Sequence, residues 1–330
     1  MEPTAPDSLQ GRGDVDGVTA VILTHMRPTL AGDLTRSLIE VEGLAPQAII
    51  VVVNGVGGLD DPELEAKVKM VRLPENLGPA GGFKVGILEA FSDPDTKWAY
   101  LCEDDIGLLP LPRPRLSGLM ARLAAYGGLQ PIGAVVAFGR SFVGRGSHTV
   151  NDVPPATTPH ALAPTHVGSW GATVMSRLVF ERGILPDTDW YFGLEDFDWY
   201  CRIREAGLEV LVDVEAAEKV AAQQTTEGRR GVLAARRPTD GDEAWRAYYH
   251  ARNSFALARR HGNPTWHFWH VAYSARKLQQ AQSSDERVAI VHGLWDGVLG
   301  RMGEHPSYHR RIGELPSSRC PGSEDTASPR

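Results

Sequence analysis

Residues 18–28, VTAVILTHMRP, begin the folded part of this sequence and decide its class. The first seven form a short, continuous apolar run, which is typical of a strand buried on both faces. A helical pattern of apolar residues follows through Leu34, Leu38 and Ile39, and a second apolar run occupies residues 48–53. Buried strands that alternate with helices predict a parallel sheet covered by helices on both faces.

The alternation continues along the chain. We expect a third strand near residues 68–73, a helix over 83–91 and a fourth strand over 98–102. An amphipathic helix over 194–206 and two or three helices between 242 and 301 complete the pattern. The sequence therefore predicts an α/β fold with a C-terminal helical extension. In such sheets ligands bind beyond the carboxyl ends of the strands, so the residues after each strand are candidate site residues.

The composition is that of an ordinary globular protein. The chain has 330 residues, of which 42% are hydrophobic and 23% charged, outside the disordered and collagen-like classes. No apolar run reaches the roughly 18 residues that a membrane-spanning helix needs, and the polar N-terminus lacks the features of a secretory signal. The three cysteines lie far apart with no Cys-x-x-Cys pair, which predicts reduced thiols. We expect a cytoplasmic protein.

The charge is spread unevenly. The formal net charge of −7 argues against general nucleic-acid binding. Residues 226–311 nevertheless carry 14 Lys and Arg against 8 Asp and Glu. Together with the aromatic residues of 261–312, this composition fits helices that lie peripherally on the inner face of an anionic membrane. Core packing or a homo-oligomer interface is the alternative interpretation.

Four segments are expected along the chain. Residues 1–16 and 316–330 contain turn-forming residues without hydrophobic periodicity, which predicts two disordered tails. Between them, residues 17–240 form the predicted α/β domain and residues 241–315 the predicted C-terminal helical region.

Three consecutive acids, Glu103, Asp104 and Asp105, directly follow the fourth strand. Burying them without compensation would be costly, and a divalent cation would supply that compensation. On an extended segment Glu103 and Asp105 would point the same way and could hold one Mg²⁺ or Mn²⁺, while Asp104 would face elsewhere. Three acids in a plain surface turn are the alternative.

Two further segments could do chemistry. Residues 76–82, NLGPAGG, precede a helix, where glycines and free N–H groups suit a phosphate, although a helix-capping turn without a ligand has the same pattern. In residues 190–199, WYFGLEDFDW, acids stand at a helix start, which the helix dipole alone would favour. The aromatic residues around them would raise a carboxylate pKa toward that of a general base.

A last segment, residues 248–253, opens an amphipathic helix with the sequence YYHARN. Its histidine and arginine are expected by default to be packing or ion-paired residues. The arginine could instead meet a phosphate.

Six segments together resemble the family 2 glycosyltransferases (GT2) of the GT-A fold, and specifically their bacterial galactofuranosyltransferase and rhamnosyltransferase branch. They are residues 24–28 (THMRP), 76–83 (NLGPAGGF), 101–106 (LCEDDI), 170–172 (WGA), 194–199 (LEDFDW) and 248–253 (YYHARN). They occur in the family's order and cover most of residues 18–260. The resemblance implies a nucleotide-diphospho-sugar transferase sheet with helices on both faces.

The resemblance also implies a role for each matching residue. The nucleotide base and ribose would be held by Thr24, Arg27 and Asn54. The ribose and diphosphate would be approached by Asn76, Gly78, Gly81 and Gly82. The remaining contacts with the donor or acceptor would come from Asp104, Trp170, Gly171, His250 and Arg252. Glu103 and Asp105 match the metal ligands of the family's Asp-x-Asp motif, and Asp196 matches its catalytic base, with Glu195 beside it.

Three positions depart from the family pattern. An acid pair or acid-Asn pair is usual after the second strand, but here Val53 precedes Asn54, which leaves uridine and thymidine both open. Glu103 replaces the usual first aspartate of the metal motif. A histidine ligand is expected within residues 215–226, which contain none. The candidates to replace it are Glu218, Gln223 and Gln224, or the diphosphate itself.

The resemblance implies an inverting, metal-dependent glycosyltransferase that uses a UDP- or dTDP-sugar of the deoxyhexose or furanosyl type. The acceptor hydroxyl would belong to a cell-envelope glycan or glycolipid, or to a small natural product. Two other classes stay open: a nucleotidyltransferase, and a catalytically inactive nucleotide-sugar-binding protein.

Overall fold

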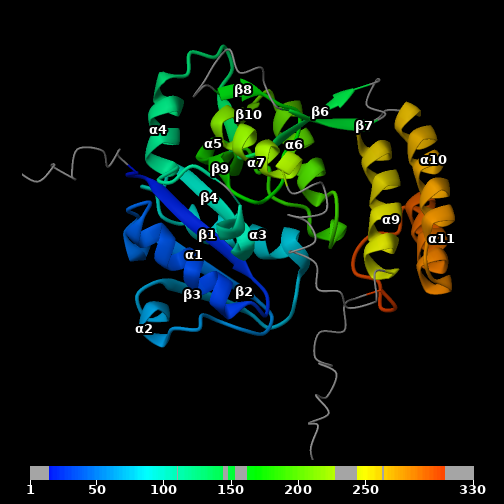
Figure 1. The fold of residues 1–330 in the computed structure, drawn as a ribbon, viewed down its shortest axis with the longest axis horizontal. Helices are drawn as coiled ribbons and strands as arrows, with labels where there is room; N and C mark the ends of the chain where they lie inside the picture. The colour runs from blue at the N-terminus through cyan, green and yellow to red at the C-terminus, as the bar shows by residue number, and fades with distance from the viewer. Residues whose placement is uncertain are drawn as a thin grey trace, which may run out of the picture.

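The computed structural model describes residues 15–109, 111–143, 148–152, 162–226, 244–261 and 264–308. Its centre is an eight-stranded sheet with the strand order β3-β2-β1-β4-β9-β5-β10-β8 (Figure 1). The strands of this sheet are β1 (Val18–Thr24), β2 (Ile49–Asn54), β3 (Lys69–Leu73), β4 (Trp98–Glu103), β5 (Ile132–Val136), β8 (Leu162–Pro164), β9 (Thr173–Ser176) and β10 (Glu209–Asp213). The four strands expected in the first third of the sequence are confirmed.

The sheet is mostly parallel. Strands β3, β2, β1 and β4 run parallel to one another, and β5 runs parallel to β10. Strand β9 is antiparallel to both β4 and β5, and β8 is antiparallel to β10. The predicted α/β class is therefore confirmed, and the register of β1 and β4 places Leu23 beside Glu103. The residues that follow these two strands consequently lie next to each other.

Helices cover both faces of the sheet because its central strands are apolar on both faces. Val21 and Leu23 of β1 pack with helices α3 (Gly78–Ala90) and α6 (Glu195–Glu205), whereas Ala20 and Ile22 pack with α1 (Pro28–Glu40) and α4 (Leu116–Ala125). Helix α7 spans Val214–Thr226. The shorter helices are η1 (Pro46–Ala48), α2 (Pro62–Glu65), η2 (Asp104–Leu108), α5 (Arg177–Glu181) and η3 (Thr188–Trp190).

Three C-terminal helices lie side by side at the end of the molecule opposite β1, β2 and β3 (Figure 1). They are α9 (Ala244–Arg260), α10 (Pro264–Gln280) and α11 (Ser284–Leu299), and they confirm the helical pattern expected there. A hairpin, β6 (Gly139–Val143) and β7 (His148–Asp152), accompanies them. Its Phe142 packs with Trp190, Ala256 and Leu257, which joins the hairpin to α9.

Several expectations fall outside the described residues. These are most of the N-terminal tail, the whole C-terminal tail and the boundary between residues 240 and 241. The division into a domain at 17–240 and a helical region at 241–315 therefore remains a prediction.

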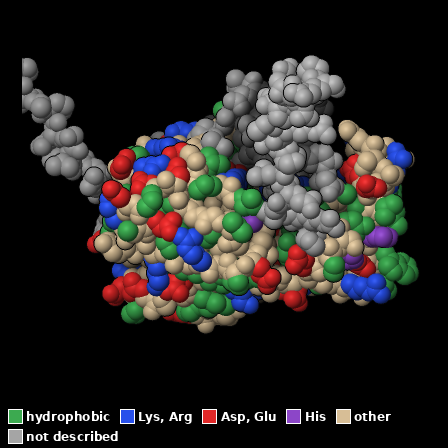
Figure 2. All heavy atoms as spheres, turned by 90° about the horizontal axis from the view of Figure 1, so that it is seen from below, with side chains coloured by type: hydrophobic (Ala, Val, Ile, Leu, Met, Phe, Trp, Pro, Cys, Tyr) green, Lys and Arg blue, Asp and Glu red, His purple; other side chains and the backbone are tan. Residues whose placement is uncertain are grey.

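The surface bears on the expected partners. On the face shown in Figure 2, acidic and basic side chains are interspersed without a continuous basic area, as the net charge suggested. Within the described ranges, no helix combines the length and hydropathy needed to cross a bilayer. Large apolar side chains are exposed on α10 and α11, including Phe268 at 68% and Trp295 at 61%. Membrane contact and self-association through these helices remain predictions.

Candidate active site

The acids after β4 meet the residues after β1. Thr24 Oγ1 donates a hydrogen bond of 2.8 Å to Oδ2 of Asp104. Arg27 reaches both neighbouring carboxylates, with Nη2 2.5 Å from Oδ1 of Asp104 and Nη1 3.2 Å from Oδ2 of Asp105. Both aspartates are buried, at 1% and 7% exposure, so they require a cation nearby. The guanidinium of Arg27 supplies this cation, and its expected contact with the nucleotide base remains a prediction.

The backbone of the acidic segment also differs from the expectation. Strand β4 ends at Glu103, and Asp104 begins the 3₁₀ helix η2, so Glu103 and Asp105 do not alternate along one extended strand. Burial raises the pKa of Asp104 to about 6, opposed by Arg27 and Thr24 and increased by Asp105. Glu103 points toward another expected residue: a Cβ atom at Gly171 would lie 3.9 Å from Oε2 of Glu103.

A second group surrounds the start of α3. Asn54 is buried, and its Nδ2 donates to the carbonyl of Gly78 at 3.0 Å while its Oδ1 accepts from the N–H of Leu77 at 2.8 Å. Oδ1 of Asn76 accepts from the N–H of Gly78 at 2.9 Å. The Asn54 amide is thus used to hold the glycine-rich turn, which corrects the expectation that it recognises the base.

The glycines of this turn serve packing. Gly78 has φ of +71°, and a Cβ there would overlap the carbonyl oxygen of Tyr191. A Cβ at Gly82 would overlap Leu23 of β1, and one at Gly81 would overlap Leu77. Close approach of α3 to the sheet and to the segment before α6 therefore explains these glycines. Their contact with a diphosphate remains a prediction.

The segment that leads into α6, which we call the 187–194 loop, is strained. Tyr191 has φ of 56° and ψ of −62°, and the N–H of Phe192 donates to the carbonyl of Trp190 at 2.7 Å. These values define a classic γ-turn, a rare and strained conformation. Leu194 has φ of 67°, in the left-handed region that side chains other than glycine seldom adopt. The loop delivers Glu195 and Asp196 at the start of α6.

The strained positions cluster at the candidate site. Within the described ranges, the non-glycine residues with positive φ are Met26, Ala172, Tyr191 and Leu194. Each is within four residues of a residue that the sequence singled out. Strained backbone persists where surrounding structure holds it, and it concentrates at active sites.

The two acids that begin α6 differ in environment. Glu195 is 5% exposed, and its Oε2 has no hydrogen-bond partner. Burial, followed by the charges of Asp196 and Glu103, raises the pKa of Glu195 well above its usual range. Burial also raises the pKa of Asp196 to about 6, opposed by the N–H of Phe197 and by the charge of Arg140 on β6. Burial therefore favours the protonated form of both acids, and the pKa of Asp196 is close to neutral.

The negative charge of Glu103 contributes to the raised pKa of Glu195. The acids after β4 and the acids at the start of α6 therefore lie within electrostatic reach of each other. Trp170 also lies near Glu195. Its ring is 2% exposed and stacks with Phe83 and Trp199 at centroid distances of 5.0 and 4.9 Å. It therefore packs the core beside Glu195, and its buried ring does not line an acceptor surface.

Helix α9 is hydrogen-bonded to the backbone of the 187–194 loop. Nδ2 of Asn253 lies within hydrogen-bond distance of three loop carbonyls, at 3.1 Å from Trp190, 2.8 Å from Phe192 and 2.6 Å from Gly193. Asn253 is fully buried. The sequence analysis quoted Asn253 within the segment YYHARN without assigning it a role. Its position next to Arg252 in an amphipathic helix was the only sequence feature that pointed to it.

Arg252 is part of the same contact. It is 1% exposed, its Nη2 donates to the carbonyl of Trp190 at 2.9 Å, and its Nη1 donates to the carbonyl of Gly303. The guanidinium also lies over the rings of Tyr248 and Tyr249. The expectation that Arg252 contacts a pyrophosphate is corrected, because its donors are directed to protein carbonyls inside the fold.

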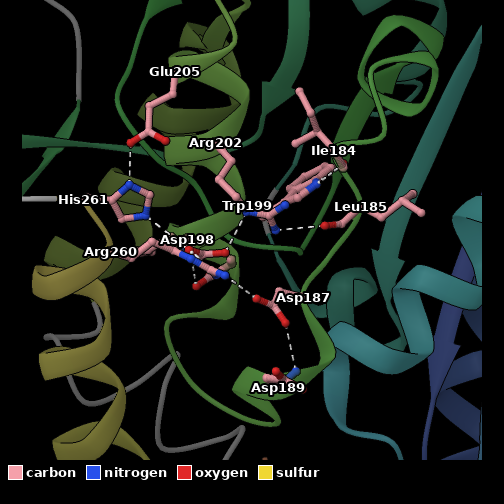
Figure 3. Close-up of polar contacts among 12 residues, drawn as sticks. Ile184, Leu185, Asp187, Asp189, Asp198, Trp199, Arg202, Glu205, Arg260 and His261 are labelled. Atoms are coloured by element: carbon pink, nitrogen blue, oxygen red, sulfur yellow. Dashed lines mark hydrogen bonds and ion pairs between the residues drawn. The ribbon is translucent and has the colours of Figure 1, made fainter. Parts of the chain in front are cut away.

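The third acid of α6, Asp198, has a structural role (Figure 3). It accepts from Nε of Arg202 at 2.9 Å and Nη1 of Arg260 at 3.0 Å, and it lies 3.2 Å from Nε2 of His261. Burial would raise its pKa, but these partners lower it below the usual value. Burial lowers the pKa of His261, yet its bonds to Asp198 and Glu205 raise it overall. These contacts attach α6 to the end of α9.

His250 lies on α9 beside helix α10. Its ring lies edge-on to Tyr273 of α10 at 5.6 Å, and desolvation together with the charge of Lys277 lowers its pKa. These contacts fit the packing role expected of His250 by default, and its contact with the donor or acceptor remains a prediction. His250 also lines a cavity between the C-terminal helices.

No third metal ligand is identified in the part of the chain that the structure describes, where no three His, Cys, Asp or Glu side chains are grouped to hold an ion. Asp213, at the end of β10, is used by Arg115 and Arg122. Glu218 lies on α7, and the side chains of Gln223 and Gln224 lie outside the described residues.

Comparisons with known proteins identify the fold. No protein-family model matches the chain, and no curated protein matches it. Among solved structures, the chain resembles a mannosyltransferase from Pyrobaculum calidifontis in complex with GDP-Man and Mn²⁺, with a TM-score of 0.41, 15% identity and 87% of each chain covered. It also resembles GalNAc-T7 with UDP, GalNAc and Mn²⁺, with a TM-score of 0.53 and 12% identity over 86% of this chain and 56% of that one.

This chain has the GT-A fold. The likeness to GalNAc-T7 extends over about half of that protein's length, and at 12% identity it concerns the fold alone. Within the GT-A sheet, the carboxyl ends of β1 and β4 carry Thr24, Arg27 and the acids Glu103 to Asp105. The galactofuranosyltransferase or rhamnosyltransferase branch remains a prediction from the sequence.

Proposed function

We propose that this protein is an inverting glycosyltransferase that moves a sugar from a nucleoside diphosphate to an acceptor hydroxyl, with Asp196 as the catalytic base. One observation carries the proposal. Two acidic segments some ninety residues apart in the sequence come close enough for Glu103 to raise the pKa of Glu195, next to an Asp196 whose pKa is about 6. A carboxylate with such a pKa is suited to general-base catalysis at neutral pH.

The proposed reaction is a single displacement. Asp196 takes the proton of the acceptor hydroxyl as its oxygen forms a bond to the anomeric carbon of the donor. The bond from that carbon to the diphosphate oxygen breaks at the same time, the electron pair leaves with the nucleoside diphosphate, and the configuration inverts. Glu195, whose pKa is raised by burial and by the charges of Asp196 and Glu103, lies beside this base.

The residues present fit a divalent cation. Glu103 and Asp105 are hard oxygen donors at the end of β4, and a cation would offset the repulsion among the acids that raises the pKa of Asp104 and of Glu195. When bound, Mg²⁺ or Mn²⁺ would neutralise charge on the departing diphosphate. Since Arg27 already contacts Asp105, these two acids with the diphosphate as a further ligand would form a weak site.

The donor is proposed to be a UDP- or dTDP-sugar of the deoxyhexose or furanosyl type, in keeping with the family that the sequence resembles. The structure of GalNAc-T7, which shares this fold, contains UDP and Mn²⁺. The acceptor is proposed to be a glycan, glycolipid or natural-product hydroxyl. We place the reaction in the cytoplasm, with peripheral contact to the inner face of the membrane through α10 and α11.

Binding of nucleotides tests the donor site. Calorimetry with UDP, dTDP, GDP and CDP, each with and without Mn²⁺, is expected to reveal one metal-dependent ligand in the wild-type protein. Asp105→Ala should abolish that binding, whereas Glu181→Gln, which removes an exposed carboxylate on α5, should not. Absence of binding by every nucleotide to the folded protein would contradict the glycosyltransferase proposal.

A second experiment separates enzyme from binding protein. Asp196→Asn is expected to abolish transfer to an acceptor while leaving nucleotide affinity nearly unchanged, because a general base contributes to the transition state. An inactive binder would show no donor turnover in the wild-type protein. Turnover of a sugar phosphate with a nucleoside triphosphate would indicate a nucleotidyltransferase instead.

A further inference from the structure

The hairpin of β6 and β7 forms a two-stranded sheet of its own, outside the main sheet. Three backbone hydrogen bonds, of 2.8, 3.0 and 3.2 Å, join Arg140 to His166 and Val167, which lead into the turn before β9. In Figure 1 the hairpin lies beside α6 and α9, in agreement with the place of Phe142 in the apolar cluster around Trp190. These contacts fix the position of β6 relative to the main sheet and to α9.

Phe142 shows which face of β6 is turned toward α6. Its ring lies edge-on to the ring of Phe197, with the two centroids 6.3 Å apart. Arg140 is two positions before Phe142, and side chains two positions apart on a strand lie on the same face. Asp196 directly precedes Phe197 at the start of α6. The side chain of Arg140 is therefore on the face of the hairpin that meets the proposed catalytic base.

The electrostatics of Asp196 agree with this placement. Burial raises the pKa of Asp196 to about 6, and a backbone N–H and the positive charge of Arg140 oppose that rise. Glu195 and Tyr200 also lie near Asp196, because its charge adds to the effect of burial in raising the pKa of each. Glu103 acts on the same two groups. Of the residues that the structure describes, only Arg140 contributes a positive charge that acts on Asp196.

The buried cations of α9 are directed elsewhere. Nη2 of Arg252 donates to the carbonyl of Trp190 at 2.9 Å. Arg260 forms ion pairs with Asp187 at 2.7 Å and with Asp198 at 3.0 Å. Neither arginine therefore replaces Arg140 as a positive charge for the proposed base.

Arg140 acts on Asp196 without a direct ion pair. Its side chain is exposed, and within the described ranges it makes no ion pair. His166, the titratable residue bonded to its backbone, accepts the N–H of Phe142 with Nδ1 at 2.8 Å. A direct ion pair would occupy the carboxylate oxygens that have to receive the proton. A positive charge at longer range favours the ionised carboxylate and leaves these oxygens to the acceptor.

We propose that Arg140 acts through Asp196 as its counter-ion: the β6–β7 hairpin holds this positive charge close enough to keep the carboxylate ionised when the acceptor hydroxyl binds. The inference rests on the proposed function, in which Asp196 is the base. The ionised carboxylate is the form that accepts the proton of the hydroxyl, so the hairpin contributes to the reaction although Arg140 itself takes up no proton.

The pH dependence of transfer tests this role. An exposed charge without direct contact is partly screened, so its removal should move the acid limb of the kcat profile to higher pH by about half a pH unit. Arg140→Gln should then transfer about threefold more slowly than the wild-type protein at about pH 5, with equal rates above about pH 7.5. Arg140→Lys, which keeps the charge, should retain the wild-type profile. Lys67→Gln, which removes an exposed cation between α2 and β3, should retain it as well.

Ionic strength distinguishes an effect of charge from an effect of shape. The screening distance falls from about 10 Å in 0.1 M salt to about 3 Å in 1 M salt, so the difference between the wild-type and Arg140→Gln profiles should shrink at the higher concentration. A difference that salt leaves unchanged would mean that the side chain acts by its shape. An equal loss of rate at every pH would mean that Arg140 binds the acceptor directly. Either result would overturn the inference.

The titration of Asp196 can also be followed without turnover, by the carboxyl carbon resonance of aspartate-labelled protein, assigned with Asp196→Asn. This resonance should titrate at higher pH in Arg140→Gln than in the wild-type protein. If it titrates at the same pH in both while metal-dependent nucleotide binding is normal, the inference about Arg140 alone is wrong. If no nucleotide binds to the folded protein, the proposed function is wrong and the inference falls with it.

Discussion

Replacement of Asn253 by alanine tests how the catalytic base is held in place. Its amide lies within hydrogen-bond distance of the carbonyls of Trp190, Phe192 and Gly193. The Trp190 carbonyl has two further donors, Nη2 of Arg252 and the N–H of Phe192, so it stays paired in the variant. The other two carbonyls lose the hydrogen bond from Asn253.

The expected loss of stability follows from the two carbonyls that lose a hydrogen bond. Each buried carbonyl left without a donor costs about 1–3 kcal/mol, so the two together cost roughly 2–6 kcal/mol. The two non-glycine residues of the 187–194 loop with positive φ store strain of a similar size, about 1–3 kcal/mol each. Loss of the amide therefore removes about as much stabilisation as the strained loop needs, and we expect the loop to relax away from its present conformation.

The expected consequence is kinetic. A displacement of about 1 Å at a catalytic group can cost on the order of a hundredfold in rate, so kcat should fall by about that factor in Asn253→Ala. Donor affinity should change little, because Asn253 contacts none of the residues at the end of β4. The assay is single-turnover transfer at saturating donor, together with nucleotide calorimetry and hydrogen exchange of residues 190–194.

A matched variant isolates positioning from stability. Leu123→Ala truncates a buried side chain of α4 in the hydrophobic cluster on the opposite face of the sheet, and such truncations cost about 2–5 kcal/mol. It should lower the melting temperature as Asn253→Ala does, with kcat preserved. If Asn253→Ala loses stability but keeps the wild-type kcat, the amide is a structural contact only and the reasoning is refuted.

Three further predictions concern pH and packing. The rate of transfer should rise with pH and level off above about pH 6, because Asp196 acts as a base in its ionised form. A rate that does not change between about pH 5 and about pH 7 would show that Asp196 is not the base. Since the pKa of His261 is raised overall in the folded state, its stabilising contact with ionised Asp198 is fully present below about pH 6.5 and is lost as pH rises through the raised value. The melting temperature of His261→Asn should therefore vary less than that of the wild-type protein across that window. Gly78→Ala should destabilise the protein by about 1–3 kcal/mol or more, because φ is +71° and a Cβ would overlap the loop before α6; Gly127→Ala, with open space around it, should be neutral in the same denaturant titration.

The fold could be predicted from the sequence because its strongest signals are local. The apolar runs at residues 18–24 and 48–53 correspond to β1 and β2, and the helical patterns expected after the first and third strands correspond to α1 and α3. The position of strand β9, antiparallel between β4 and β5, could not be predicted from local patterns, because strand order depends on contacts between distant segments.

The site was predicted in part for the same reason. Acids after a buried strand and at a helix start are visible in the sequence, and the structure places Glu103 and Glu195 within electrostatic reach of each other. The sequence does not show which groups neutralise a buried charge. Arg27 and Arg252 both looked like ligands for a substrate, yet one neutralises acids 78 residues away and the other holds loop carbonyls. A single sequence does not specify the register that brings such partners together.

The four strained non-glycine residues connect these observations. Met26 precedes Arg27, Ala172 follows the turn that approaches Glu103, and Tyr191 and Leu194 lead to Asp196. A protein selected only for stability would replace such residues with glycine or asparagine, which adopt positive φ at lower cost. Their concentration where both acidic segments converge indicates that the positions of these side chains are worth more to the protein than the strain costs. Positioning of the two acidic segments, rather than stability, is therefore the property that the 187–194 loop and its contacts with α9 serve.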